Sequence, residues 1–587
     1  MRRAAAVAGV AFAALFLSSG SSQTRLFWIG AAAVIVAAVG WTVAPPALSR
    51  PALVFFAALT AFVLWQAASI AWSIQPARSW DYSNRGLAYL SFAAVGALVA
   101  GRQLAYAAAV LLGALFAWAL AAKAIPGIYD DYDRLARLRY PVGYWNELAL
   151  LAAASVPVGL WLLRRSRVAG ALLLYLALVV VVLTYSRVGI VLTLVAAIAW
   201  LVLDEEWLES IGPLGVAWIA GALVAAVGLV DGLLFGPALL AGGAAVALAL
   251  RYVVTRAVDR RVVRTVAVAL AAIVLAAFLA AVVRAGGPGD FVSDRWHEFS
   301  NPVSTQVGNT PQRIVSTSSS NRWRWWQEAW NAFVDHPLQG TGAGTFGLTD
   351  RIERDSPLAV TEPHSAPLQD LTETGLVGFV LIAVATIAAI VAIARRDKLP
   401  LALSVGICMV HSLVDIDWDY VAVQGPLFLT IGALAAGPPR VRRGWLPAAV
   451  AGACALAALY SLASPWLAKE RLNAAFDSLT HGKPVAARDE ASSAHSFNPL
   501  AVEPLWLLGA LTGERKYYVQ ARDLEPKNPE TWYELGSFEL NVLHRPRPAY
   551  RDLNHAYTLD NFLFAKRSTP ARDLDVARCM VDPSTCR

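Results

Sequence analysis

Apolar segments of membrane-spanning length recur along the whole of this 587-residue chain. A hydrocarbon core about 30 Å thick takes roughly 20 helical residues to cross. Segments approaching that length lie near residues 4–20, 26–43, 51–74, 86–101, 103–122, 147–163, 168–184, 188–203, 211–230, 233–254, 263–283, 372–394, 399–414, 420–437 and 444–467. Only 16% of the residues are charged, which is below the share typical of soluble domains. The sequence therefore predicts an all-α polytopic membrane protein with about 14 or 15 transmembrane helices.

Positive charge indicates which side of the membrane each loop faces. With the N-terminus inside, the short inner loops contain 18 Lys and Arg and the short outer loops contain 8. Cytoplasmic loops favour these residues, so the net charge of +7 needs no nucleic-acid partner. The first segment follows Met1-Arg2-Arg3 and reaches small residues, which fits either a span or a cleavable signal peptide.

This topology divides the chain into four parts. We expect an N-terminal transmembrane bundle at 1–283, a large extracytoplasmic loop carrying the active site at 284–371, further transmembrane helices at 372–467, and an extracytoplasmic helical domain at 468–587. A loop of this length is unusual enough to indicate function.

The C-terminal part contains similar segments at a repeat-like spacing. The stretches that begin at Ala521 and Ala556 are 35 residues apart, close to the period of about 34 in tetratricopeptide repeats. Trp532-Tyr-Glu-Leu-Gly536 resembles the first helix of such a repeat. We expect two or three degenerate repeats that bind a protein partner, or alternatively a plain helical cap. Cys579 and Cys586 are able to pair if this part is extracytoplasmic.

Polar residues concentrate at outer span ends and in the large loop, whereas the span interiors contain few charges. A transporter usually has ionisable residues inside its spans. The observed pattern instead favours an enzyme that acts at the membrane surface on a lipid-anchored substrate. The segments concerned are 139–147, 184–187, 320–346 and 362–378.

Most of these residues also allow simpler interpretations. Tyr144 with its neighbouring tryptophan fits an interface anchor, and Asn146 fits a helix cap. Arg187 fits a side chain that extends from a span end to the interface. Arg322 lies at the start of a predicted helix, where the helix dipole disfavours a cation, so we expect a partner anion. The Gly340-x-Gly-x-Gly344 stretch follows a helix rather than a strand, which favours a tight backbone turn over a dinucleotide site.

His364 is the strongest single candidate for catalysis. It lies between Glu362 and the start of a span, with no second His or Cys nearby to complete a metal site. A lone histidine among outer arginines suits a general base, or a group that stabilises a diphosphate leaving group, without a metal.

Together these segments resemble the O-antigen ligase and polymerase superfamily of bacterial membrane glycosyltransferases. The resemblance rests on Gly143-Tyr-Trp-Asn146, Tyr185-Ser-Arg187, Arg322-x-x-x-Trp326 with Pro337-x-x-Gly-x-Gly342, and His364-Ser through Glu373-x-Gly-x-x-Gly378. It covers roughly residues 60–435. Pro367 departs from the polar and aromatic run expected after the histidine, and the segments near 211–254 look like additional spans.

The resemblance implies a reaction and a set of roles. A glycan on a polyprenyl diphosphate carrier would be transferred to a hydroxyl of a glycan, lipid or protein acceptor, with no metal and no cofactor. His364 would assist the acceptor hydroxyl, Arg187 and Arg322 would bind the diphosphate, and Arg85 is a weaker candidate for that role. Further candidate substrate contacts are Asn146, Tyr144 and Glu362.

The resemblance also implies a location and leaves alternatives open. We expect a multi-pass protein of the bacterial cytoplasmic membrane, with its site and C-terminal domain on the extracytoplasmic face. An O-antigen ligase-like activity in cell-surface polysaccharide assembly is the leading interpretation. A polysaccharide polymerase, a protein O-oligosaccharyltransferase and a non-enzymatic lipid-glycan flippase are the alternatives.

Overall fold

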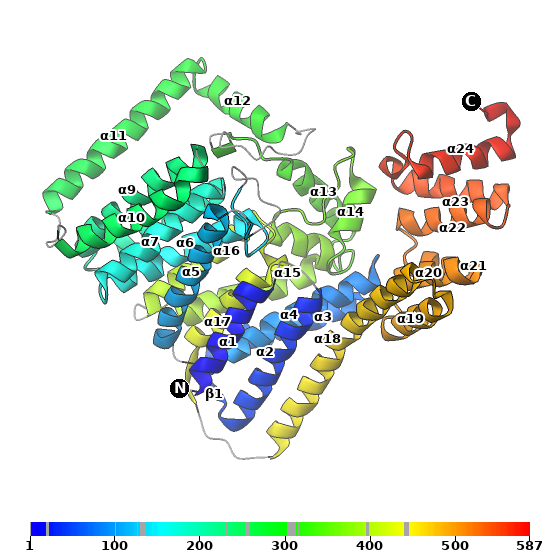
Figure 1. The fold of residues 1–587 in the computed structure, drawn as a ribbon, viewed down its shortest axis with the longest axis horizontal. Helices are drawn as coiled ribbons and strands as arrows, with labels where there is room; N and C mark the ends of the chain where they lie inside the picture. The colour runs from blue at the N-terminus through cyan, green and yellow to red at the C-terminus, as the bar shows by residue number, and fades with distance from the viewer. Residues whose placement is uncertain are drawn as a thin grey trace.

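The computed structural model describes residues 2–18, 23–99, 101–125, 127–128, 137–230, 232–252, 259–301, 313–314, 316–394, 398–439 and 445–586. It is an almost entirely helical chain (Figure 1). The described residues contain one small sheet, in which β1 (Pro46–Leu48) pairs antiparallel with β2 (Ala436–Pro439).

Each predicted apolar segment lies largely within a helix. These helices are α1 (Arg2–Leu17), α2 (Gln23–Val43), α3 (Arg50–Ser69), α4 (Pro76–Gly96), α5 (Gly101–Ala124), α6 (Trp145–Leu163), α7 (Arg167–Leu183), α8 (Arg187–Leu203), α9 (Leu208–Val230), α10 (Gly232–Tyr252), α11 (Arg260–Arg284), α15 (Ala366–Ile393), α16 (Leu399–His411), α17 (Val421–Ala435) and α18 (Trp445–Thr480). The all-α polytopic membrane fold is thereby confirmed.

The helices differ in their length and apolar character. Among the described residues, eight helices are long and apolar enough to cross a membrane: α2, α3, α5, α6, α9, α10, α15 and α18. The helices α1, α7, α8, α16 and α17 are apolar but shorter, and α11 meets α12 (Pro288–Ser300) at an angle of 87°. A total of 14 or 15 spans therefore depends on counting the shorter helices and the more polar α4.

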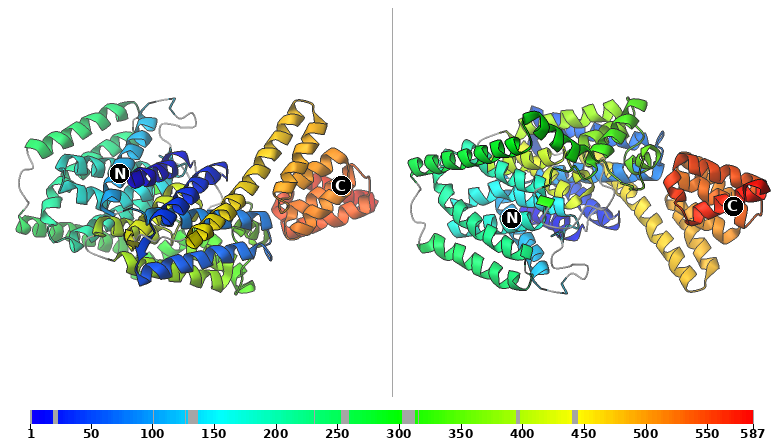
Figure 2. Two further views of the ribbon diagram at one scale, coloured as in Figure 1. Left: turned by 90° about the horizontal axis from the view of Figure 1, so that it is seen from below. Right: turned by 90° about the horizontal axis from the view of Figure 1, so that it is seen from above.

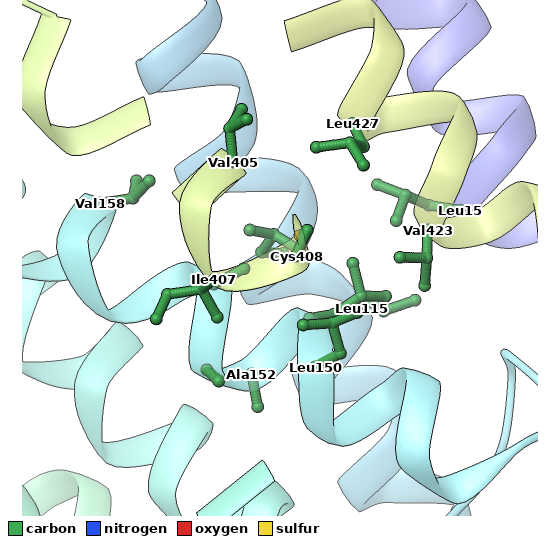
Figure 3. Close-up of a cluster of buried hydrophobic side chains, with 14 of the residues drawn as sticks. Leu15, Leu115, Leu150, Ala152, Val158, Val405, Ile407, Cys408, Val423 and Leu427 are labelled. Atoms are coloured by element: carbon green, nitrogen blue, oxygen red, sulfur yellow. The ribbon is translucent and has the colours of Figure 1, made fainter. Parts of the chain in front are cut away.

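The centre of the bundle is built around α6. In the most apolar 18-residue stretch of α6, 89% of the residues are buried. The corresponding share for α10 is 17%, which places α10 at the periphery. Figure 3 shows part of this core, where Cys408 of α16 lies among leucine and valine side chains of α1, α5, α6 and α17. Burial of this apolar surface fixes the positions of the helix ends that carry the polar residues.

Helices α4 and α17 approach each other through two glycines. A Cβ atom on Gly96 would lie 1.8 Å from the carbonyl oxygen of Leu429, and one on Gly432 would lie 1.9 Å from that of Ala93. Small residues allow the backbones of membrane helices to approach closely. Since α4 also carries polar residues beside the site, this contact fixes their position relative to the loop before α17.

We expect Gly432→Ala to destabilise the protein by about 1–3 kcal/mol or more, because the added methyl group forces these two backbones apart. The thermal unfolding midpoint of the detergent-solubilised protein measures this effect. Gly406→Ala on α16 is the matched control, since a Cβ at Gly406 meets nothing within 4 Å. Equal midpoints for both variants would contradict the close packing of α4 on α17.

The described residues between α11 and α15 include three further α-helices. The short helix α12 follows the bend after α11, and α13 (Arg322–Asp335) and α14 (Phe346–Glu353) lie next to the start of α15 (Figure 1). Buried Trp325, Ala329 and Phe346 form a small apolar core between α13 and α14. Leu368 of α15 packs against this core, which thereby holds the loop against the transmembrane bundle.

The C-terminal helices form a body set to one side of the bundle (Figure 2). They are α19 (Pro484–Phe497), α20 (Glu503–Thr512), α21 (Arg515–Leu524), α22 (Pro529–Asn541), α23 (Pro546–Leu559) and α24 (Thr569–Val581), with 3₁₀ turns η4 (Asn561–Phe564) and η5 (Pro583–Thr585). Successive helices pack on one another, and Cys579 and Cys586 form a disulfide. The assignment to tetratricopeptide repeats stays a prediction. Helix α18 runs unbroken across the expected boundary at residues 467–468.

Candidate functional site

The ends of several helices that the charge bias places on the same side of the membrane meet at one point. Asp415, in the loop between α16 and the 3₁₀ turn η3 (Asp417–Asp419), lies at the centre. It is fully buried and contacts side chains from the start of α6, the start of α13 and the segment before α15. A buried carboxylate needs such partners, because an unpaired charge away from water is very costly.

Both oxygens of Asp415 are engaged. Oδ2 accepts hydrogen bonds from Arg322 Nη2 at 2.7 Å and from Asn146 Nδ2 at 2.6 Å. Oδ1 lies 3.0 Å from Nδ1 of His364 and 3.4 Å from the hydroxyl of Tyr144. Burial opposes ionisation of Asp415, but Arg322 and His364 lower its pKa well below the usual range. Asp415 is therefore an anion that orients the groups around it.

His364 is fixed in one orientation by two contacts. Its ring stacks on Trp325 with a centroid separation of 5.1 Å, and its Nδ1 faces Asp415. An ionised carboxylate only accepts hydrogen bonds, so Nδ1 carries the proton in neutral His364 and Nε2 is left as the acceptor. The pKa of His364 lies below its ordinary value because the ring is buried, although the bond to Asp415 opposes this shift. The imidazole is consequently neutral near pH 7 and suited to accept a proton.

Four arginines surround this group. Arg187 donates hydrogen bonds to the carbonyl oxygens of Ser316 and Ser318, the latter at 2.7 Å, which joins the start of α8 to the large loop. Burial and the guanidinium groups of Arg187 and Arg322 lower the pKa of Arg313 to about 10. Arg313 Nη1 is buried and has no hydrogen-bond partner among the described residues. We call Arg137, Arg187, Arg313 and Arg322 the arginine cluster.

Arg137 completes the cluster from the segment before α6. Its Nε donates to the carbonyl of Thr184 at 2.8 Å, and its Nη2 lies 3.4 Å from Oδ1 of Asn146. Burial and the nearby Arg313 lower the pKa of Arg137 to about 9. Mutual repulsion among buried cations is relieved when an anion binds between them. A compact anion between these side chains would therefore neutralise charge that the cluster now holds close together.

Left-handed backbone conformations gather at the same residues. Tyr185 precedes Ser186-Arg187, Ser320 and Asn321 precede Arg322, and His364 itself has a φ of 55°. A residue with a β-carbon pays of order 1–3 kcal/mol for a strained conformation, which persists when the surrounding structure enforces it, and such residues concentrate at functional sites. The strained residues position the arginines and the histidine.

A second polar group adjoins the first and includes the remaining predicted residues. The Arg85 side chain is buried and bonds to the carbonyl oxygen of Asp419, with its Nη1 3.5 Å from Oδ1 of the same residue. Tyr82 donates to Asp419 at 2.7 Å. Arg78 lies 3.7 Å from Glu362, and burial raises the pKa of Glu362 to about 7. The structure thus places Arg85 in an internal ion pair, separate from the arginine cluster.

A buried donor set for a cation also lies near Asp415. Glu147, His411 and Asp417 offer ligand atoms within 4.8 Å of one another, and all three are fully buried. However, His411 Nδ1 lies 2.7 Å from Asp417 Oδ1, and Ser412 donates to Asp417 Oδ2 at 2.7 Å. Each oxygen of Asp417 thus has one of these partners and a further lone pair, so the set can hold either a cation or a proton shared between Glu147 and Asp417.

The glycine stretch forms a tight turn, as predicted. Gly340, Gly342 and Gly344 all have positive φ, and a Cβ on Gly344 would lie 2.2 Å from the ring of Tyr82. Glu373 of α15 accepts hydrogen bonds from the backbone of this turn, at 2.7 Å from the nitrogen of Gly344. The turn therefore fastens the loop to α15 and to α4.

Some sequence interpretations are corrected by these contacts. Tyr144, not Asn146, is the N-cap of α6, and the Asn146 side chain binds Asp415 instead of capping the helix. Arg187 binds carbonyl groups of the loop rather than extending to the interface. The expected anion beside Arg322 is Asp415.

Comparison with known proteins bears on part of this region. Residues 236–383 match the family model described as O-Antigen ligase. The match covers about a quarter of the chain and includes Arg322 and His364, while Asp415, Arg187 and Asn146 lie outside it. A search of curated proteins finds no match. The match to O-antigen ligase supports membership of that superfamily and, in general, a membrane protein that transfers glycans.

The position of His364 predicts the pH dependence of such a reaction. If neutral His364 accepts a proton, the rate should be constant near pH 7 and fall only below the ordinary histidine pKa of about 6.5, since burial lowers the pKa of His364. Initial rates of glycan transfer between pH 5 and 8 measure this profile. Glu362→Gln is the control: a change in rate near pH 7 that this substitution abolishes would belong to Glu362 and not to His364.

Proposed function

We propose that this protein is a membrane glycosyltransferase that moves a glycan from a polyprenyl diphosphate carrier to an acceptor hydroxyl. The observation that carries the proposal is the group centred on Asp415. This group holds a neutral histidine beside four arginines, one of which has a buried nitrogen with no partner among the residues that the structure describes. A general base next to a polycationic anion site is what transfer from a diphosphate donor requires.

The geometry supports a single displacement. His364 Nε2 removes the proton of the acceptor hydroxyl, and the resulting oxygen nucleophile attacks the sugar carbon that is bonded to the diphosphate. That carbon–oxygen bond breaks, and the diphosphate leaves with its additional negative charge. Guanidinium groups held in place before the reaction stabilise that charge at little reorganisation cost. Asp415 stabilises the imidazolium that forms.

An apolar cavity next to the site supports a lipid-linked donor. It has a volume of about 280 Å³ and lies between α15, α16 and α17, where its walls are mainly alanine, isoleucine, leucine and phenylalanine side chains. Ala366 and Pro367, which directly follow the His364 segment, line it together with Ser412. A polyprenyl chain in this cavity would present its diphosphate towards the polar residues.

The charge bias and the disulfide support an extracytoplasmic site. The helix ends that form the site lie on the side whose short loops carry 8 Lys and Arg, against 18 in the short loops of the other side, and the side with fewer generally faces away from the cytoplasm. The disulfide between Cys579 and Cys586 is typical of an oxidising compartment. Both features favour the extracytoplasmic face for the site and for the C-terminal helices.

A transfer assay with the purified full-length protein tests the proposal. The donor is a radiolabelled glycan on a polyprenyl diphosphate, and the acceptor is a detergent extract of the cell envelope of the source organism. We expect label to move to the acceptor in EDTA as well as in Mg²⁺, because the arginine cluster provides the positive charge. Transport of the donor without transfer would indicate a flippase. Loss of activity in EDTA would instead assign a cation to Glu147, His411 and Asp417.

A further inference from the structure

A cleft opens where the C-terminal helices meet the large loop. It has a volume of about 350 Å³ and is bordered by α14, the segment that precedes His364, the start of α4 and the start of α22. Polar side chains occur on every wall, and the lining that matters here comprises Gln75, Arg78, Arg351, Thr361, Asn528 and Glu530. The two parts of the chain therefore build one polar cleft together.

Ion pairs hold the two walls at a fixed separation. Arg351 Nη1 of α14 lies 2.5 Å from Glu530 Oε1 of α22, and Arg354 Nη2 lies 2.5 Å from Asp560 Oδ2. The second pair is nearly buried, with side-chain exposures of 7% and 2%. Pairs shielded from water are much less screened than surface pairs. The cleft is thus a preformed feature of the structure.

The cleft and the arginine cluster are connected to His364 in different ways. The arginine cluster connects to it through Asp415, which binds both Arg322 and His364. The cleft connects to it along the chain, because Thr361 lines the cleft and lies three residues before His364. Arg78, which also lines the cleft, pairs with Glu362. A transferase needs one binding region on the leaving-group side of its base and another on the acceptor side.

We propose that this cleft binds sugar residues of an acceptor glycan, next to the hydroxyl that His364 deprotonates. The inference rests on the proposed function and adds the class of acceptor to it. Guanidinium, amide, hydroxyl and carboxylate groups provide both donors and acceptors, as pairs of sugar hydroxyls require. The Arg78 side chain is 39% exposed, which leaves donors available to a ligand. The C-terminal helices thus supply half of the acceptor site.

Blocking the cleft tests the proposal without removing any of its ion pairs. Ala359 is exposed and lines the cleft, so Ala359→Trp would fill it. Asp355→Trp is the matched control, since Asp355 is exposed on the same segment and does not line the cleft. Initial rates are measured while the envelope extract is titrated by sugar content at saturating donor. We expect about a 10-fold higher acceptor KM for Ala359→Trp, with kcat and the donor KM unchanged.

Exchanging the charges of Arg351 and Glu530 tests whether these residues bind the acceptor or only hold the walls of the cleft together. Arg351→Glu and Glu530→Arg each break the ion pair, whereas the double variant restores it with the charges reversed. We expect the double variant to recover the thermal stability of the wild type but to keep a raised acceptor KM. Recovery of both properties would show that the pair only holds the walls together, and would overturn this inference.

The remaining outcomes are also decisive. Normal transfer by the wild type together with an unchanged acceptor KM in Ala359→Trp would remove the acceptor cleft and leave the proposed function intact. Label found in a polypeptide rather than a glycan would overturn the assigned class of acceptor. Absence of transfer by the wild type would remove the proposed function and this inference with it.

Discussion

His364→Ala is expected to reduce kcat for glycan transfer by about 10²–10⁴-fold, the usual contribution of a positioned general base. The substitution removes Nε2, the only atom of His364 that is free to accept a proton when Nδ1 faces Asp415. The proposed diphosphate site is built from other residues, so the donor KM should change little. Steady-state rates with the labelled donor and the envelope extract measure both quantities.

Two further variants test whether the loss reflects proton transfer. His336→Ala changes the nearest other histidine of the loop and should leave the rate within a few-fold of the wild type. Asp415→Asn keeps the side-chain volume but removes the charge that raises the pKa of His364 against burial. We therefore expect a lower kcat and a fall in rate that begins at a lower pH than in the wild type. Full activity of His364→Ala would show that the histidine is not the base.

The fold could be predicted from the sequence because apolar length is a strong signal. Every predicted apolar segment lies largely within a helix, since a chain in lipid must satisfy its backbone hydrogen bonds internally. The predicted and observed boundaries differ where a helix includes polar residues. Helix α4 begins at Pro76, ten residues before the predicted span, because its first turns are polar yet buried, with Ser79 bonded to the large loop and Tyr82 to Asp419 of η3. Helix α18 continues to Thr480 because a change in composition does not end a helix.

Only part of the candidate site could be predicted from the sequence. Arg187, Arg322 and His364 stand beside motifs, whereas Asp415 lies in a short loop between two helices and was missed, although three aspartates occur between 415 and 419. Arg137 and Arg313 belong to no motif that the sequence analysis identified. Arg85 stays a predicted site residue, and its buried partner Asp419 comes from a distant part of the chain. Pairing across such distances depends on tertiary packing, which local sequence does not reveal.

Arg322→Lys is expected to reduce kcat by about 10²–10³-fold, the cost of losing one donor that stabilises charge in a transition state. Lysine keeps the charge but not the planar group, which at this position binds Asp415 through Nη2 at 2.7 Å while its other nitrogens remain near Arg313 and Arg187. A single ammonium group cannot contact Asp415 and a diphosphate with the same geometry. The substitution should therefore impair both the orientation of the base, which depends on Asp415, and the stabilisation of the leaving diphosphate.

Inhibition by inorganic pyrophosphate distinguishes these two effects. If Arg322 binds the diphosphate, Arg322→Lys should weaken inhibition by about 10-fold, because an arginine bond to a charged group contributes about 1.5–3 kcal/mol. Arg324→Lys is the matched control on the same helix, since Arg324 binds Glu328 and Leu358 instead of the site. Unchanged inhibition with a reduced kcat would restrict Arg322 to orienting Asp415. Unchanged kcat and unchanged inhibition would remove Arg322 from the site and, with it, the strongest link between the arginine cluster and the leaving group.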